Sequence, residues 1–341
     1  MTPRGAFQIA GRDIAPGTRS TVELPVSVLS DHTPVTISVH VVHGRRPGPV
    51  IFVSAAIHGD EVIGVEIVRR LLKAPQLKGM AGTLLAVPIV NTFGFLNQSR
   101  YLPDRRDLNR VFPGSASGSL AARLAHIFLT QVVLRCSFGI DLHSAAVQRS
   151  NLPQLRLTPG NPRLLDLARA FGAPVILQSK LREGSLRLVA EASGVDVLLY
   201  EAGEGLRFDE GAARTGVAGI LSVMAALGMI PARGIPRPTV PPVTCNRSYW
   251  VRAPAGGLIR THRTIGDLVE GGALLGTVSD PFGLVDVPLA APETGIIIGR
   301  SHLPIVNEGD ALFHIAVPDR TSGLIAPPLD TPALLDEDEI I

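Results

Sequence analysis

Three side chains of this chain have types and spacings suited to binding one metal ion: His58, Glu61 and His143. His58 and Glu61 are three residues apart in the sequence HGDE, so both can converge on one ion from a loop or the first turn of a helix. Zinc accepts imidazole nitrogen and carboxylate oxygen together, and three protein ligands leave a position for water. The sequence therefore predicts one Zn²⁺ per chain in a site of the hydrolytic type.

The candidate ligands follow predicted β-strands. The apolar run PVIFVSAAI ends at His58, SFGIDL ends at His143, and VDVLLY ends just before Glu201. Taken separately, the His58–Glu61 pair also fits helix capping, and His143 also fits a hydrogen-bonded structural histidine. Ligands of open α/β sheets bind beyond the carboxyl ends of the strands, so the shared position favours a single site.

Strands alternate with amphipathic helices through the first two thirds of the chain. This order predicts an α/β fold with a mainly parallel, mixed sheet flanked by helices. A loop rich in polar and turn residues at 91–118 is long for a connection, and such loops often carry function. The predicted helices cover 60–73, 119–135, 164–172, 185–194 and 210–228, and further strands cover 21–29, 34–42, 83–90 and 174–178.

The proline-dense segment at 231–245 predicts a linker between two units. We expect a zinc hydrolase domain with an N-terminal β segment at 1–235, an all-β module at 246–318, and an acidic, proline-containing tail at 319–341. The module resembles the biotinyl/lipoyl carrier type of β-sandwich or barrel. No lysine follows Lys180, so it has no attachment residue. Access to the site or homo-oligomer contacts are the roles left open for it.

Composition narrows the class of partner. The net charge is only +2, and the basic residues form no stripe that would indicate binding to nucleic acid or to an anionic membrane. No stretch reaches the ~20 apolar residues of a membrane span, and the first residues lack a secretory signal, so we expect a cytoplasmic protein with a small-molecule substrate. Cys136 and Cys245 are expected to be reduced and structural, and His262, His302 and His314 to be structural or surface residues.

Four motifs in order, HGDE, RYLPDRRDLNRVFPG, DLHS and YEAG, resemble the succinylglutamate desuccinylase and aspartoacylase family. The resemblance spans roughly residues 45–230. It implies the zinc carboxypeptidase fold and hydrolysis of an amide bond in N-acylated amino acids or related small acids. It also implies that the zinc ligands are the three residues named above.

The second motif carries the substrate contacts that the resemblance implies. Asn109 and Arg110 would hold a substrate carboxylate, Arg110 through the two parallel hydrogen bonds that a planar guanidinium can donate. Arg100 would polarise the scissile carbonyl and stabilise the oxyanion. Arg105 and Arg106 are interpreted as surface residues.

Acidic residues complete the implied machinery. Asp107 would orient a zinc-bound histidine, a contact that ligating imidazoles usually need, and Asp141 could serve a neighbouring group in the same way. Glu201 would act as the general base that takes a proton from water and later delivers it to the leaving amine. Glu204 lies close enough in sequence to compete with Glu201 for this role.

Two alternatives remain. A metallocarboxypeptidase acting on short peptides would use the same ligands but needs an open groove. A catalytically inactive small-molecule-binding relative would keep the fold and lack a ligand or the base, whereas every motif residue is present here.

Overall fold

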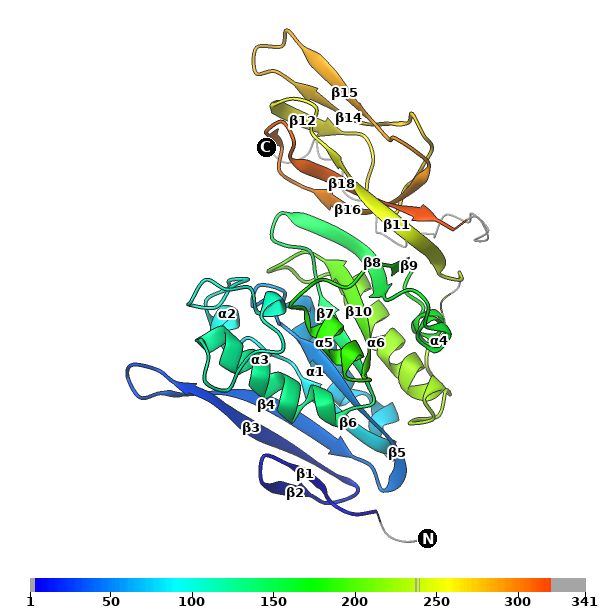
Figure 1. Ribbon diagram of the computed structural model, residues 1–341. Helices are drawn as coiled ribbons and strands as arrows, with labels where there is room; N and C mark the ends of the chain where they lie inside the picture. Colours follow the sequence, from blue (N-terminus) through cyan, green and yellow to red (C-terminus); the bar gives the residue numbers. More distant parts are fainter. Residues whose placement is uncertain (1–3, 237, 239, 320–341) are drawn as a thin grey trace.

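The computed structural model describes residues 4–319 except 237 and 239, so the predicted tail at 319–341 lies outside the described residues apart from Asp319. Three regions follow one another in space: a long N-terminal hairpin, a central sheet covered by helices, and a C-terminal group of strands (Figure 1). Among the described helices, none is long and apolar enough to cross a membrane.

A twelve-stranded mixed sheet forms the frame, in the order β13-β16-β18-β11-β9-β8-β10-β7-β5-β6-β4-β3. Parallel pairing is confined to the middle, between β11 and β6, and the β8–β10 pair there is antiparallel. Both flanks of the sheet are antiparallel. The strands from the first part of the chain are β3 (Thr18–Val28), β4 (Pro34–His43), β5 (Arg46–Ala55), β6 (Ala81–Val87), β7 (Phe138–His143), β8 (Arg149–Leu157), β9 (Val175–Gln178) and β10 (Asp196–Gly203).

Helices cover both faces of the central strands because those strands are apolar on both sides. In β5, Ile51 and Val53 join the core that includes α1, α4 and α6, whereas Phe52 joins the opposite core with α3 and α5. The helices are α1 (Ile63–Lys73), α2 (Thr92–Leu96), α3 (Leu120–Gln131), α4 (Pro162–Phe171), α5 (Leu186–Ala192) and α6 (Glu210–Ala226). A separate small hairpin precedes them, β1 (Phe7–Ile9) with β2 (Arg12–Ile14).

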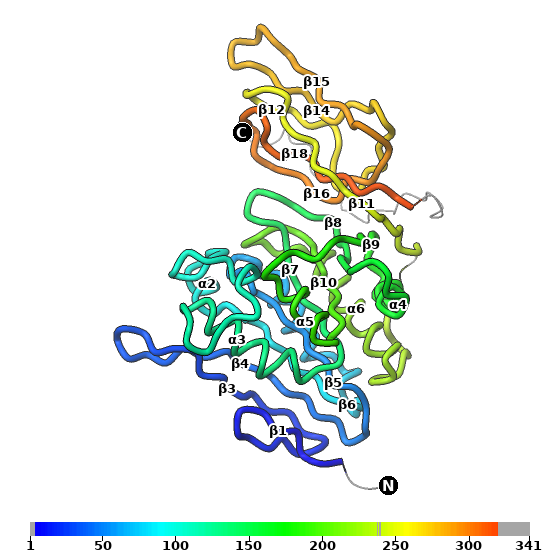
Figure 2. The backbone as a smooth tube through the Cα atoms, viewed as in Figure 1, coloured from blue at the N-terminus to red at the C-terminus, as the bar shows by residue number. Residues whose placement is uncertain are grey.

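The C-terminal strands extend the central sheet. β11 pairs in parallel with β9, and β16 pairs with β8, so the two parts of the chain share one hydrogen-bonded sheet (Figure 2). A second, four-stranded sheet has the order β15-β14-β12-β17. The strands are β11 (Val243–Arg252), β12 (Gly257–Thr261), β13 (Leu268–Val269), β14 (Leu274–Ser279), β15 (Asp286–Ala290), β16 (Gly295–Ser301), β17 (Ile305–Val306) and β18 (Ala311–Pro318). The separate module at 246–318 stays a prediction.

Two elements close to the candidate site differ from the sequence-based expectation. The long loop at 91–118 contains the short helix α2, which Asn91 caps by accepting a hydrogen bond from the Gly94 N–H at 2.9 Å. The sequence analysis did not predict β8, because RSNLPQLRL includes a proline and its leucines do not alternate regularly with polar residues. The structure accommodates it by pairing β8 with strands distant in sequence.

Packing between α1 and α6 gives the first prediction. Ile67 is fully buried, and its side chain fills the space beside Gly216 of α6. Ile67→Ala should lower the free energy of unfolding by about 2–5 kcal/mol, because it leaves a cavity in a core that can relax only partly. Urea denaturation measures the change. Lys73→Ala, at an exposed position of the same helix, is the control and should stay within about 0.5 kcal/mol. Equal losses in the two variants would contradict this packing.

Candidate metal centre

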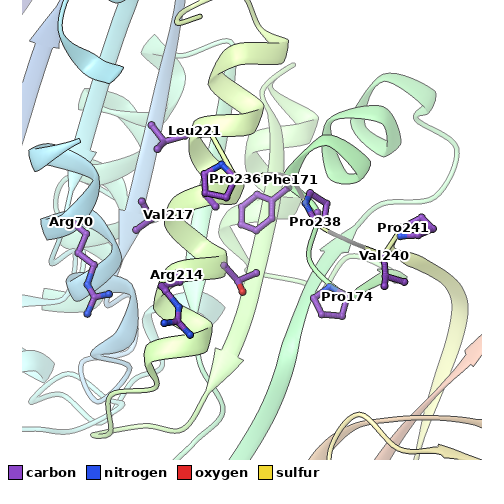
Figure 3. Close-up of a pocket in the computed structure, with 13 residues that line it drawn as sticks. Arg70, Phe171, Pro174, Arg214, Val217, Leu221, Pro236, Pro238, Val240 and Pro241 are labelled. Carbon is purple, nitrogen blue, oxygen red and sulfur yellow. The ribbon is translucent and has the colours of Figure 1, made fainter. Parts of the chain in front are cut away.

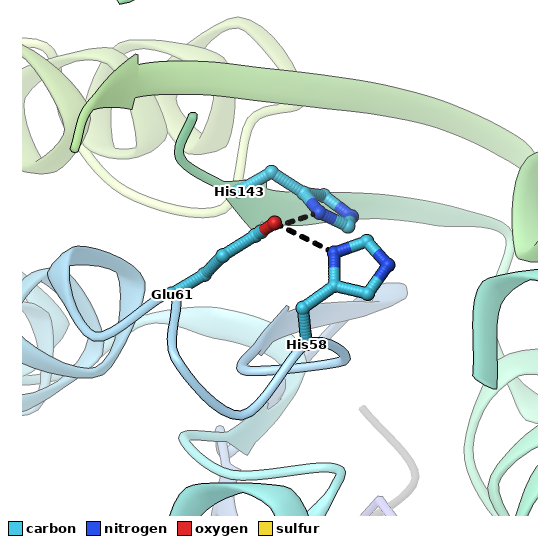
Figure 4. Close-up of side chains that lie close together, drawn as sticks. All are labelled: His58, Glu61 and His143. Carbon is cyan, nitrogen blue, oxygen red and sulfur yellow. Dashed lines mark hydrogen bonds and ion pairs between the residues drawn. The ribbon is translucent and has the colours of Figure 1, made fainter. Parts of the chain in front are cut away.

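The three predicted ligands lie together where β5 and β7 end (Figure 4). Glu61 stands between the two imidazoles, with Oε1 2.7 Å from His58 Nδ1 and Oε2 2.8 Å from His143 Nδ1. The three candidate donor atoms lie within 4.8 Å of one another, and all three side chains are buried. The Ser144 N–H also donates to Glu61 Oε2, at 3.2 Å.

A tight turn after β5 directs His58 into the cluster. Ala56 has a φ of 51°, a left-handed conformation uncommon for a residue other than glycine. Gly59 packs on the backbone of α2, where an added Cβ would come within 1.9 Å of the Gly94 carbonyl carbon. The HGDE loop therefore needs glycine at this position, and α2, which the sequence did not predict, supports the loop.

Two further carboxylates contact the outer nitrogens of the imidazoles. Asp107 Oδ1 is 3.1 Å from His58 Nε2, and Asp141 Oδ2 is 2.8 Å from His143 Nε2. Ser54 Oγ donates to Asp141 at 2.7 Å. Because a carboxylate only accepts hydrogen bonds, each Nε2 must carry a hydrogen. Nδ1 of each ring faces the Glu61 carboxylate in the same way. A cation bound there would replace the Nδ1 proton and take its lone pair, while the aspartate keeps the hydrogen on Nε2.

The charges of the cluster suit a divalent cation. Burial disfavours ionisation of Glu61, but the positive charges of the two histidines hold its pKa well below the usual range. Burial also opposes the charge of His143, yet Asp141 and Glu61 raise its pKa well above the usual value. A cation at Nδ1 would replace the ring protons and leave both rings neutral. The carboxylates of Glu61, Asp107 and Asp141 and the guanidinium of Arg100 would then leave two negative charges. A divalent ion neutralises them.

Arg100 and Glu201 flank this cluster. The Arg100 guanidinium donates to Asp107 Oδ2 at 2.9 Å and to Glu61 Oε1 at 3.3 Å. Glu201 lies beside His143 in the β10–β7 pairing and lines the same pocket. Glu204 is used elsewhere, because it accepts a hydrogen bond from the Gln148 N–H and pairs with an arginine. The geometry therefore favours Glu201 over Glu204 as the acid that faces the pocket.

Asn109 and Arg110, which are predicted to bind a substrate carboxylate, also line this pocket, but the Asn109 side chain is already partly engaged. Asn109 Oδ1 accepts from the Leu186 N–H at 2.9 Å, so this oxygen fixes the start of α5. Arg110 is exposed and donates to the Asn109 carbonyl at 2.6 Å. Arg105 and Arg106 are exposed and do not line the pocket.

The pocket has a volume of about 580 Å³, in the usual range for small-molecule sites. Sequence reasoning missed part of its wall. His314, expected to be structural or surface, lines the pocket and stacks on Trp250 with ring centroids 4.6 Å apart. Burial, together with the charges of nearby arginines, lowers the pKa of His314 to about 3, so this ring is neutral. No local motif marks these residues, because the pairing of β11 with β18 brings them together.

Arginines that no motif indicated also line the pocket, among them Arg156 on β8 and Arg187 on α5. Arg187 is only 8% exposed, and within the part of the chain that the structure describes neither its Nη1 nor Arg156 Nε has a hydrogen-bond partner. Burial lowers the pKa of Arg187, and the charge of Arg156 adds to this effect. Both guanidiniums line the pocket, although these two nitrogens are themselves buried.

A second hollow, of about 530 Å³, lies between α1, α4, α6 and the proline-rich segment (Figure 3). Its lining is mostly apolar, with Arg70 and Arg214 at one side. None of the predicted site residues lines it. The predicted site residues line the pocket at the carboxyl edge of the sheet instead.

The sequence model of the succinylglutamate desuccinylase/aspartoacylase catalytic domain matches residues 47–227, and the chain belongs to this family. The match confirms the resemblance drawn from the four motifs. It covers all of β5 but its first residue, the helices α1–α6 and all the predicted site residues.

Relatives extend the likeness over most of the chain. An N-alpha-acetyl-L-2,4-diaminobutyric acid deacetylase from Halomonas elongata is 28% identical over 295 residues, which are 83% of this chain and 86% of the relative. The solved succinylglutamate desuccinylase/aspartoacylase from Rhodobacter sphaeroides aligns with a TM-score of 0.77 at 23% identity, covering 88% of this chain and 96% of that one. The product-bound ectoine utilization protein EutE (DoeB) from Ruegeria pomeroyi gives 0.79 at 22% identity, with 92% and 98% covered. These structural matches show that the fold is shared.

The cluster of His58, Glu61 and His143 predicts that the protein binds one zinc ion. The protein should bind about one equivalent of Zn²⁺, and His143→Ala should weaken binding by at least about a hundredfold, since it removes a donor from a set of three. Calorimetric titration of the chelator-treated protein measures both affinities. His262→Ala, at an exposed histidine outside the cluster, should bind as the unmodified protein does. Unchanged affinity in His143→Ala would exclude this cluster as the metal site.

Proposed function

We propose that this chain is a zinc-dependent amidohydrolase that removes the acyl group from a small N-acylated amino acid or a related carboxylate. The family assignment and the deacetylase relative support hydrolysis of an amide bond. The observation that carries the proposal is the content of one pocket: three candidate metal ligands, a guanidinium and a further carboxylate at the carboxyl edge of the sheet.

His58, Glu61 and His143 would hold the metal ion. Two imidazoles whose outer nitrogens contact carboxylates, together with a buried carboxylate, are a donor set that zinc prefers. A bound zinc ion supplies Lewis acidity, which polarises the acyl carbonyl and makes water a better nucleophile at neutral pH.

The remaining steps fall to side chains of the chain itself. Glu201 would accept a proton from the attacking water and return it to the amine nitrogen as the C–N bond breaks. Arg100 would donate hydrogen bonds to the carbonyl oxygen as it gains negative charge. The contacts of Arg100 with Asp107 and Glu61 hold the guanidinium before substrate binds, so little reorganisation accompanies the reaction.

The charge of the pocket supports an anionic substrate. Seven basic side chains line it against three acidic ones. Arg156 and Arg187 are among them, and guanidiniums suit pairing with a substrate carboxylate. The same excess of positive charge argues against an amine part that carries a cationic side chain, such as the diaminobutyrate named for the Halomonas elongata relative.

The shape of the pocket supports a small substrate. Ser248, Trp250 and His314, from the C-terminal strands, form part of its wall. A long peptide would have to pass this wall, so the peptide-cleaving alternative is less well supported.

An activity screen tests the proposal. The zinc-loaded protein should release free amine from a panel of N-acetyl, N-succinyl and N-aspartyl amino acids, with little turnover of short peptides. Glu201→Gln should lower kcat by about 10²–10⁴-fold with KM little changed, because it removes the general base but keeps the side-chain shape. Glu204→Gln is the matched control and should retain activity.

Two outcomes would contradict the proposal. Turnover of peptides alone would support a metallocarboxypeptidase. Full zinc occupancy without turnover of any substrate in the panel would support an inactive binding relative.

A further inference from the structure

β8 connects the candidate base to the C-terminal part of the chain. One edge of β8 pairs antiparallel with β10, which carries Glu201, and residues 149–151 pair with β16 (Figures 1 and 2). Asn151 lies at the crossing, with Gly203 of β10 and Gly299 of β16 as its Cα partners. It stands at the register shift of β10 between Glu201 and Gly203.

The Asn151 side chain binds the Glu201 carboxylate directly. Asn151 Nδ2 donates to Glu201 Oε2 at 2.9 Å, and Arg156 Nη1 lies 3.6 Å from Oε1. Asn151 is 8% exposed and the Glu201 side chain 13% exposed, so water competes little for this bond. A hydrogen bond to an ionised acceptor is stronger than one between neutral groups, and here it restricts rotation of the carboxylate.

Gly299 leaves room for the Asn151 amide. A Cβ at position 299 would lie 2.8 Å from Asn151 Oδ1 and 3.2 Å from His314 Cβ. The amide oxygen therefore occupies space that any other residue at 299 would fill. With the oxygen accommodated there, the amide nitrogen faces Glu201, the only orientation in which the amide can donate to a carboxylate.

We propose that Asn151 is a positioning residue that holds the Glu201 carboxylate for proton transfer, and that Gly299 leaves the space that the Asn151 side chain needs for this contact. The proposal rests on the proposed role of Glu201 as general base. It gives the C-terminal strands a part in catalysis, because Gly299 lies outside the stretch at 47–227 that matches the family's catalytic domain.

Asn151→Leu tests the role of Asn151. Leucine has a similar volume but cannot donate a hydrogen bond. We expect kcat to fall roughly tenfold to a hundredfold with KM within about threefold, because a misplaced base slows proton transfer without weakening substrate binding. Ser150→Ala is the matched control, since the Ser150 hydroxyl contacts His302 and not Glu201. It should keep both constants.

Gly299→Ala tests the role of Gly299, a residue that does not line the pocket. It should reproduce the loss of kcat, and adding it to Asn151→Leu should cause little further loss, because both changes act through one hydrogen bond. Gly256→Ala is the matched control, since the nearest atom to its added Cβ is 3.7 Å away. Tm and the emission of Trp250, the only tryptophan of the chain, report whether each variant retains its fold and pocket wall.

The outcomes separate the two proposals. A kcat of Asn151→Leu within about threefold of Ser150→Ala, or a loss confined to KM, overturns the role of Asn151. Additive losses in the double variant overturn the role of Gly299. If Glu201→Gln stays active, the proposed base is wrong, whereas an inactive Glu201→Gln beside an active Asn151→Leu overturns only the positioning. Should Asn151→Leu fail to fold, Gly299→Ala makes the same kcat and KM comparison.

Discussion

The Glu61 carboxylate between His58 and His143 is the contact on which the rest of the site depends. A buried carboxylate is costly unless charged or donating groups surround it, and here two imidazoles and a backbone N–H do so. Asp107 and Asp141 then fix the outer nitrogens of the rings. The excess negative charge of this arrangement makes a divalent cation its natural complement.

The sheet brings these groups together and joins them to the C-terminal strands. The neighbouring parallel strands β5 and β7 place His58 and His143 at one edge, and β10 adds Glu201 beside them. The pairing of β16 with β8 and of β11 with β9 continues the sheet into the later part of the chain. As a result, the pocket combines ligands from the first part of the chain with a wall from the last.

Much of the metal site could be predicted from sequence because its residues carry local signals. The His58–Glu61 spacing, the apolar strands before each ligand and the order of the motifs all point to the same place. Asn151 and His314 carry no such signal, because their positions depend on pairing between distant strands: Asn151 pairs with Gly299, 148 residues later, and His314 with Trp250, 64 residues earlier. β8 also lacks a clear alternating pattern and includes a proline, so the strand that supports Glu201 could not be anticipated.

The most direct test of the metal centre is a crystal structure of the zinc-loaded protein with an anomalous difference map at the zinc absorption edge. The account predicts one strong peak about 2.0–2.2 Å from Nδ1 of His58, Nδ1 of His143 and a carboxylate oxygen of Glu61, with both Nε2 atoms still bonded to their aspartates. A peak elsewhere, or coordination through Nε2, would contradict it.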